Sequence, residues 1–463
     1  MKKKYPLRTI LTAGAVLVVA FLVLGAVSVA GWEYSNSNYF CSTACHAVHP
    51  EETFAHQSSH HANVDCVECH IGRLSTFRAM LEKSGHIVHA WTFFAGYERP
   101  LYAPSFAGAQ ESCEGCHTQE PHRHNTVNAY TRFGSDRRNT EKKLTMTVRL
   151  NGRTFGGEER RDIDWHSSGA VRYISDDPQN QQIRWVEATQ PDGSTLVYSN
   201  VAAPLGEAEI NEADKQVMDC ADCHNRAGHP FRDPEEEIDR ALADNRLSAE
   251  LPFVKARALE LLEQEVESEE EARELVKQAW DKYAADFPDL EKSNPEAWNA
   301  AREFMEERQE FMADLMVRSQ FVDAEEVSWR SFPDHNGHKL DPGCFRCHSG
   351  RLQADDGTPI TVNCTNCHSI PLVTKRDRVP DHFLSLIDMK KPTSHRDPAF
   401  MSKHSELSSE ICETCHGDLR FGVSDRTYCS NSGCHGEVWQ YLDLDALRTI
   451  AAIETAEENE AAN

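Results

Sequence analysis

All sixteen cysteines of this 463-residue chain stand in pairs, and a histidine directly follows each pair. The spacer is two residues in six pairs, three between Cys41 and Cys45, and four between Cys429 and Cys434. The eight motifs are Cys41-Cys45-His46, Cys66-Cys69-His70, Cys113-Cys116-His117, Cys220-Cys223-His224, Cys344-Cys347-His348, Cys364-Cys367-His368, Cys412-Cys415-His416 and Cys429-Cys434-His435. Cys-x-x-Cys-His is the attachment signature of haem c, whose vinyl groups bond the two sulfurs while the histidine reaches the iron. We therefore expect eight covalent haem c groups, or seven if one long spacer fails.

Zinc sites and disulfides are weaker readings of the same cysteines. Zinc needs four ligands but no trailing histidine, and disulfide scaffolds are usually far shorter chains. A mean hydropathy of -0.58 and an aromatic content of 8% leave little material for large protein cores. The expected fold class is a multihaem cytochrome c, mainly α and irregular, with a haem-filled core.

The remaining histidines can supply the second, distal ligand of each iron. Fifteen of the 23 histidines lie outside the motifs, which is enough for eight distal positions. The best-placed candidates are His60, His61, His166, His229, His338, His382, His395 and His404, and His122 and His124 are further possibilities. Each of them alone could also be an ordinary surface histidine.

An uncharged stretch from Thr9 to Trp32 is long enough to cross a hydrocarbon core of about 30 Å. Basic residues precede it, so the positive-inside rule leaves the N-terminus in the cytoplasm. The expected location is a bacterial inner membrane, with one pass and the bulk of the chain in the periplasm. A signal peptide cleaved after Ser28-Val29-Ala30 is the alternative. The outer interface would hold Trp32, Tyr34 and Tyr39.

The spacing of the motifs divides the chain into seven parts. They are an anchor (1–32), a three-haem module (33–125), a β-rich insertion (126–215), the fourth motif (216–232), an acidic helical insertion (233–328), a four-haem module (329–441) and an acidic tail (442–463).

Apolar periodicity indicates the elements between the motifs. A helix is expected over 74–94, and β segments over 144–150, 171–174, 183–188 and 195–198. Two helical stripes are Ala256, Leu259, Leu262 and Val266, and Ala297, Ala301, Phe304, Arg308, Phe311 and Leu315. The short helix expected after Leu442 precedes a tail that is expected to be disordered.

Charge narrows the class of partner. The net charge of -26 makes nucleic acid a poor ligand, since that polyanion is bound through Lys and Arg. Residues 233–326 hold 28 acidic against 11 basic side chains. These acidic side chains can be the solvated face of an antiparallel helical pair. Alternatively, they form a docking surface for a basic protein.

Two groups of motifs carry a resemblance to known families. The stretch from Tyr39-Phe40-Cys41 through Cys66-Val67-Glu68-Cys69-His70 to Lys83, together with Cys220-Ala-Asp-Cys223-His224, resembles the NapC/NirT/NrfH membrane-anchored quinol dehydrogenases. The blocks around His224, His348 and His435 look like the larger inner-membrane multihaem cytochromes of metal-respiring bacteria. The resemblance implies a periplasmic haem module in which quinol is oxidised beside the first haem. The chain departs from that family at the first motif, which has a three-residue spacer after Cys41 and Val48 in place of a family methionine. For the iron of the first haem, this leaves binding by His46, binding by His49 or an open position.

Quinol oxidation also requires a proton acceptor at the membrane surface. Candidates near the first two motifs are Asp65, Glu68, Glu82, Lys83, His86 and His89, and the resemblance aligns Lys83 with a lysine near the quinol pocket. We therefore expect a menaquinol site at Lys83, Glu82, His86 and His89, in a quinol:cytochrome c oxidoreductase that feeds periplasmic cytochromes. The alternatives are an electron-carrying subunit without its own quinol site, or a multihaem reductase of a small nitrogen or sulfur oxyanion.

Overall fold

The computed structural model describes most of the chain before residue 300 and parts of the rest. The described residues are 6–45, 51–95, 107–117, 125–150, 163–190, 192–266, 268–293, 295–296, 298–299, 331–362, 364–368, 372–374, 410 and 440–443. Several predictions lie outside them: the seventh and eighth motifs, His46, His49, His122, His124, His382, His395, His404, the whole second helical stripe and the acidic tail after residue 443.

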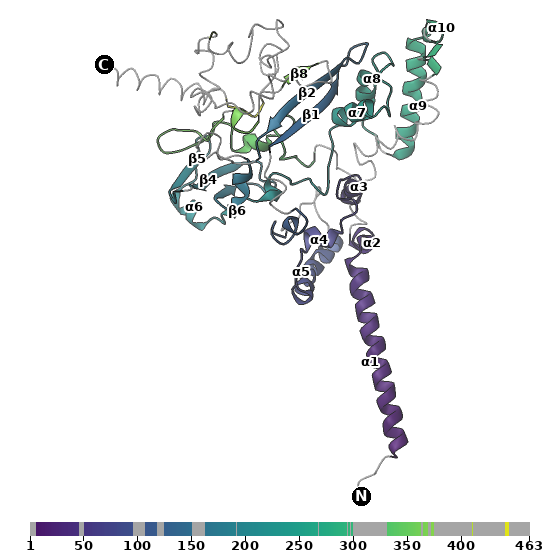
Figure 1. Cartoon of the computed structure of the whole chain (residues 1–463), viewed down its shortest axis with the longest axis vertical. Helices are drawn as coiled ribbons and strands as arrows, with labels where there is room; N and C mark the ends of the chain where they lie inside the picture. Colours follow the sequence, from purple (N-terminus) through teal and green to yellow (C-terminus); the bar gives the residue numbers. More distant parts are fainter. Residues whose placement is uncertain are drawn as a thin grey trace, which may run out of the picture.

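A long helix, α1 (Leu7–Asn36), projects from the rest of the molecule (Figure 1). Its apolar segment Leu11–Asn36 has 26 residues and no buried part, so it is a candidate single-pass anchor. The hydroxyl of Ser37 then accepts the N–H of Phe40 and caps the short helix α2 (Asn38–Phe40). That helix runs directly into a π-helical turn, Cys41–Cys45, which carries the first pair of cysteines.

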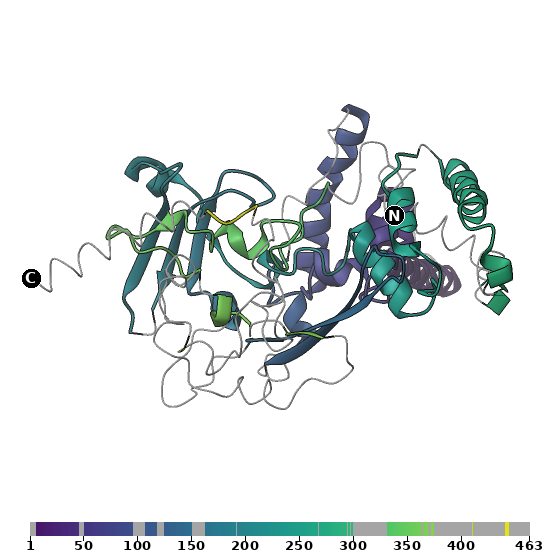
Figure 2. The same ribbon diagram turned by 90° about the horizontal axis from the view of Figure 1, so that it is seen from above.

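Three helices follow α1 on the same side of the molecule. They are α3 (Glu51–Gln57), α4 (Cys66–His70) and α5 (Thr76–Ala95), the last at the position of the predicted helix 74–94. In Figure 1, α5 lies beside the upper part of α1, and from above, in Figure 2, it runs across the direction of α1.

Two antiparallel sheets occupy the middle of the chain; the predicted β segments coincide with β2 to β5, whereas β1 was not predicted. The first sheet has the order β1-β2-β8, with β1 (Thr126–Phe133), β2 (Glu141–Val148) and β8 (Leu372–Thr374). The second has the order β6-β3-β4-β5-β7, with β3 (Val171–Ser175), β4 (Ile183–Thr189), β5 (Thr195–Asn200), β6 (Gln216–Val217) and β7 (Leu352–Gln353). The β region is therefore not a self-contained insertion, because β7 and β8 come from the C-terminal haem region.

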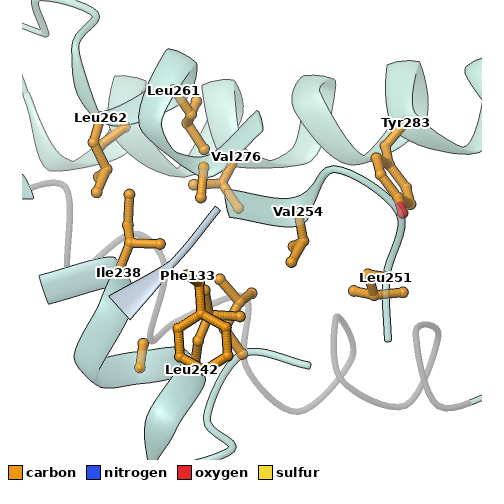
Figure 3. Packing of buried hydrophobic residues seen from close by; sticks show 13 residues of the cluster. Phe133, Ile238, Leu242, Leu251, Val254, Leu261, Leu262, Val276 and Tyr283 are labelled. Atoms are coloured by element: carbon orange, nitrogen blue, oxygen red, sulfur yellow. The ribbon is translucent and has the colours of Figure 1, made fainter. Parts of the chain in front are cut away.

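The acidic region forms helices that pack on the first hairpin. After α6 (Glu207–Glu212) come α7 (Pro234–Ala243), α8 (Val254–Leu262), α9 (Glu269–Asp286) and α10 (Leu290–Ser293). Figure 3 shows their shared core, in which Phe133 of β1 lies among side chains of α7, α8 and α9. The core face of α8 is Val254, Ala258, Leu261 and Leu262, and Leu259 and Val266 pack against the same core, so the predicted stripe is confirmed at Leu259, Leu262 and Val266 but is narrower than the buried face. The reason is that α8 packs against two neighbours, which buries a wider face than a single stripe.

One buried cation joins this helical region to the sheet. Lys255 is 2% exposed, and its Nζ donates to the carbonyl of Phe133 at 2.6 Å. The same Nζ donates to Asp239 at 2.8 Å and Glu235 at 2.9 Å. A second conventional core, around Val171, Tyr173 and Val186, lies in the five-stranded sheet. The expected haem-filled core is therefore not confirmed for these two regions, which have protein cores of their own.

Candidate haem sites and the contacts between them

Four of the two-residue motifs adopt the same backbone turn. In each, the carbonyl of the first cysteine accepts the N–H groups of the second cysteine and the histidine, at 2.8–3.3 Å. The four begin at Cys113, Cys220, Cys344 and Cys364. The motif that begins at Cys66 forms the helical turn α4. Both sulfurs and the imidazole thus leave the backbone from one turn, which is the arrangement that haem attachment requires.

Four motif histidines each face a second imidazole ring. The centroid separations are 5.9 Å for His61 and His117, 6.0 Å for His229 and His70, 5.8 Å for His166 and His348, and 6.3 Å for His338 and His368. The ligating nitrogen lies roughly 1.1 Å from each centroid, which leaves about 4 Å, or two metal–imidazole bonds of about 2 Å. The separations therefore match those of two imidazoles that would hold one iron atom through their Nε2 atoms.

All four partner rings are among the distal candidates that the sequence provided. The neighbouring candidate His60 is exposed and, within the described part of the chain, is not paired with a motif histidine.

Hydrogen bonds fix the orientation of four of these rings. The Nδ1 atoms of His61, His166, His229 and His348 each bond a backbone carbonyl, at 3.1, 3.0, 2.8 and 2.6 Å. A carbonyl only accepts, so each Nδ1 carries the proton and each Nε2 keeps a lone pair. This is the usual second interaction of metal-bound histidine, and it leaves Nε2 for the metal.

Burial favours the neutral form of four of the paired rings, those of His166, His229, His338 and His348. It lowers the pKa of His166 and His338, and it lowers the pKa of His229 and His348 to about 4. A neutral imidazole is the form that binds iron. The residues present therefore fit iron held between two imidazoles, and among the described residues no cluster of three or more His, Cys, Asp or Glu offers a competing metal site.

His335 is a buried histidine that is not a candidate ligand. It is buried and burial lowers its pKa to about 4, but Nδ1 bonds the carbonyl of Asp222 at 2.9 Å. Its Nε2 is also engaged, 2.7 Å from the amide of Gln181, so no lone pair is left for a metal. A lowered pKa alone does not identify a ligand, whereas the closeness of a second imidazole ring to a motif histidine distinguishes the candidates.

Two further histidines complete the described set. His56 on α3, which was not among the sequence candidates, has its ring centroid 5.8 Å from that of His229, and His224 belongs to the fourth motif. His224 is exposed, and no other ring of the described chain is paired with it.

Direct contacts join the first motif to the second. The side chain of Asn38 accepts the N–H of Cys66 at 2.8 Å, and the thiols of Cys41 and Cys66 share a hydrogen bond. That bond, together with the charge of Lys83, lowers the pKa of the free Cys41 thiol to about 7. The two attachment points are therefore neighbours.

Arg73 joins the second motif to the third. Its guanidinium pairs with Glu68 at 3.0 Å and donates to the carbonyl of Gly115 at 2.7 Å and to the sulfur of Cys116 at 3.0 Å. A Cβ on Gly115 would lie 2.6 Å from this guanidinium, so a larger residue there would displace the Arg73 side chain. Glu68, a proton-acceptor candidate in the sequence, is therefore engaged in an ion pair.

The following motifs also touch in sequence order. The N–H of Ala109, just before the third motif, donates to Asp219, just before the fourth, at 3.3 Å. Arg346, inside the fifth motif, donates to the carbonyl of Asp222, inside the fourth, at 2.7 Å.

The fifth and sixth motifs share one loop. The carbonyl of Thr361 bonds His348, and the hydroxyl of Thr361 accepts the side-chain N–H of Asn366, at 3.1 Å. The first six motifs therefore form a continuous chain of contacts.

Lys83 lies where α5 meets the end of α1. Its half-buried ammonium donates to the carbonyl of Ser35 at 2.7 Å and to the side chain of Asn36, and lies 5.0 Å from the ring centroid of Trp32. Glu82, the next candidate, is exposed. The side chains of His86 and His89, further along α5, are outside the part that the structure describes.

An apolar anchor helix followed by closely connected Cys-x-x-Cys-His motifs defines the class of membrane-attached multihaem c-type cytochromes. Comparison with known proteins agrees. The chain is 32% identical over 368 residues to the cytochrome c-type protein ImcH of Geobacter sulfurreducens. The aligned residues make up 79% of this chain and 70% of that protein. The chain belongs to the ImcH family of c-type cytochromes.

Covalently bound haem c and a role in electron transfer follow from this membership. No family model matches the chain, so its predicted membership of the NapC/NirT/NrfH family is not confirmed. No solved structure matches it either.

Proposed function

We propose that this protein is an octahaem cytochrome of a bacterial inner membrane that oxidises menaquinol and passes electrons to periplasmic cytochromes. The observation that carries the proposal is an unbroken series of contacts. It begins with Lys83, at the end of α1 and beside the first motif, and continues through the sixth motif.

Haem c, when bound, supplies one-electron transfer at each iron. We propose that His61, His229, His166 and His338 are the distal ligands opposite His117, His70, His348 and His368. Two imidazoles per iron leave no open coordination position, so these four sites suit electron transfer and not substrate reduction. This favours the electron-transfer reading over the oxyanion reductase.

The proposed quinol site lies at Lys83. Its ammonium is held against the backbone of Ser35 and the ring of Trp32, at the level where the apolar helix ends. A fixed cation at this depth can donate a hydrogen bond to a quinol oxygen and stabilise the charge that develops when the oxygen loses its proton. Exposed Glu82, with His86 and His89 further along α5, would accept the two protons and release them to the periplasm.

The proposed path follows the motifs in sequence order. Because the cysteines would hold the edges of the haem groups, contacts between neighbouring motifs would bring successive haem groups near one another, and the sulfurs of Cys41 and Cys66 lie within hydrogen-bond distance before attachment. Arg73 and Arg346 keep the next steps short by clamping adjacent turns. A net charge of -26 favours partners with basic docking surfaces.

The test compares two lysines with similar surroundings. Lys83 lies over Trp32 near the anchor, whereas Lys215 lies 4.5 Å over Trp185 in the five-stranded sheet. The Lys83→Gln variant should reduce its haem more slowly with a menaquinol analogue, by about tenfold or more, since a hydrogen bond to a charged group contributes about 1.5–3 kcal/mol. Lys215→Gln should behave as the parent protein.

Reduction by dithionite should be unchanged in both variants, because it does not use the quinol site. Equal quinol-driven rates for Lys83→Gln and the parent protein would reject this site and favour a carrier subunit that is reduced by another membrane protein.

A further inference from the structure

We propose that α5 is a second membrane contact, which lies in the headgroup layer with its outward face in the acyl chains of the lipid. No part of the proposed electron path requires this contact. It rests only on α1 being the membrane anchor.

The pattern of exposure on α5 is the reverse of that on a helix of a soluble domain. The side that faces the protein carries buried Ala79 and the half-buried Lys83. The opposite side carries Phe77, Met80 and Leu81, which are 71%, 55% and 56% exposed. These three residues have the i, i+3, i+4 spacing of one helix face. Such a face is stable only against an apolar partner.

The depth of α5 identifies lipid as that partner. The 26-residue apolar segment of α1 is about 39 Å long at about 1.5 Å per residue, so it exceeds a hydrocarbon core of about 30 Å. Its last turn, with Ser35 and Asn36, therefore reaches the headgroup layer. Lys83 bonds both of these residues, which holds the middle of α5 at that depth.

The direction of α5 agrees with its depth. Figures 1 and 2 together show that it runs across the axis of α1, as a helix lying in the plane of the bilayer does. Exposed Tyr34 and Tyr39 stand at the same end of α1. Aromatic residues of this kind are enriched at the membrane interface.

The test is photolabelling of the full-length, haem-loaded protein in nanodiscs that contain a phospholipid with a diazirine on its acyl chain. Trypsin releases the outward face of α5 as two peptides, 74–78 with Phe77 and 79–83 with Met80 and Leu81. We expect lipid adducts on both of them and on α1. The control peptide, 185–215, carries exposed Leu196 and Val201 far from α1 and should stay unlabelled.

Labelling of α1 without labelling of either α5 peptide would overturn the proposal, and so would cross-links from α5 to a second copy of the chain in place of lipid. If α1 itself stays unlabelled, the anchor assignment fails with it. The double variant Phe77→Ser/Leu81→Ser, with its haem spectrum retained, should lose the adducts on Met80. The matched variant Leu196→Ser/Val201→Ser should keep them.

Discussion

Replacing His166 by alanine should convert one low-spin haem to high spin. The rings of His166 and His348 have centroids 5.8 Å apart, which leaves about 3.6 Å between the facing nitrogens and hence about 1.8 Å for each bond to a central iron. Both rings are held by carbonyls through Nδ1, and no second ligand stands ready in the described surroundings. If all eight motifs carry haem, as proposed, about one eighth of the iron should change its spin state.

The assay is the electron paramagnetic resonance spectrum of the oxidised protein, with the haem content measured in parallel. Added imidazole should restore low-spin iron, because alanine leaves a cavity of the size of the lost ring. The control is His335→Gln, since His335 is equally buried but has both ring nitrogens in hydrogen bonds. A fully low-spin His166→Ala protein with all its haem would refute the pairing, as would the same high-spin signal from His335→Gln.

Two further substitutions test the contacts between elements. Gly115→Ala should displace the guanidinium of Arg73, because the new Cβ would lie 2.6 Å from it, and a redox titration should then show a lowered midpoint potential for at least one haem as the cation withdraws. An unchanged titration would contradict this role. Lys255→Met should destabilise the helical region by about 3–5 kcal/mol, because the buried carboxylate of Asp239 loses its nearer cation, at 2.8 Å, and keeps only Arg132 at 3.5 Å. Thermal unfolding followed by circular dichroism measures the change, and Lys282→Met, which loses only an exposed pair, is the control.

The motifs made the attachment sites predictable, because haem chemistry fixes the spacing of two cysteines and a histidine. The same local logic predicted α1, α5 and the strands β2 to β5, whose apolar periodicity is strong. It also placed His61, His166, His229 and His338 among the distal candidates, but it could not distinguish them from the other candidate histidines.

The partner of each ring could not be predicted, because pairing depends on tertiary contacts. His166 lies about 180 positions before His348, and the carbonyls that orient the rings belong to residues without any sequence signature. The bridge formed by Arg73 was missed for the same reason, since an arginine after Gly72 resembles an ordinary surface residue. The stripe on α8 was predicted narrower than the buried face, because its second packing partner, α9, could not be known in advance.

The central claim is that quinol at the membrane reduces the whole haem chain of this protein. The most direct test is anaerobic mixing of the detergent-purified protein with a menaquinol analogue, followed at the α-band of reduced haem with and without a quinol-site inhibitor. The account predicts rapid, inhibitor-sensitive reduction of most of the haem that dithionite can reduce. Full reduction by dithionite with no reduction by quinol would contradict it.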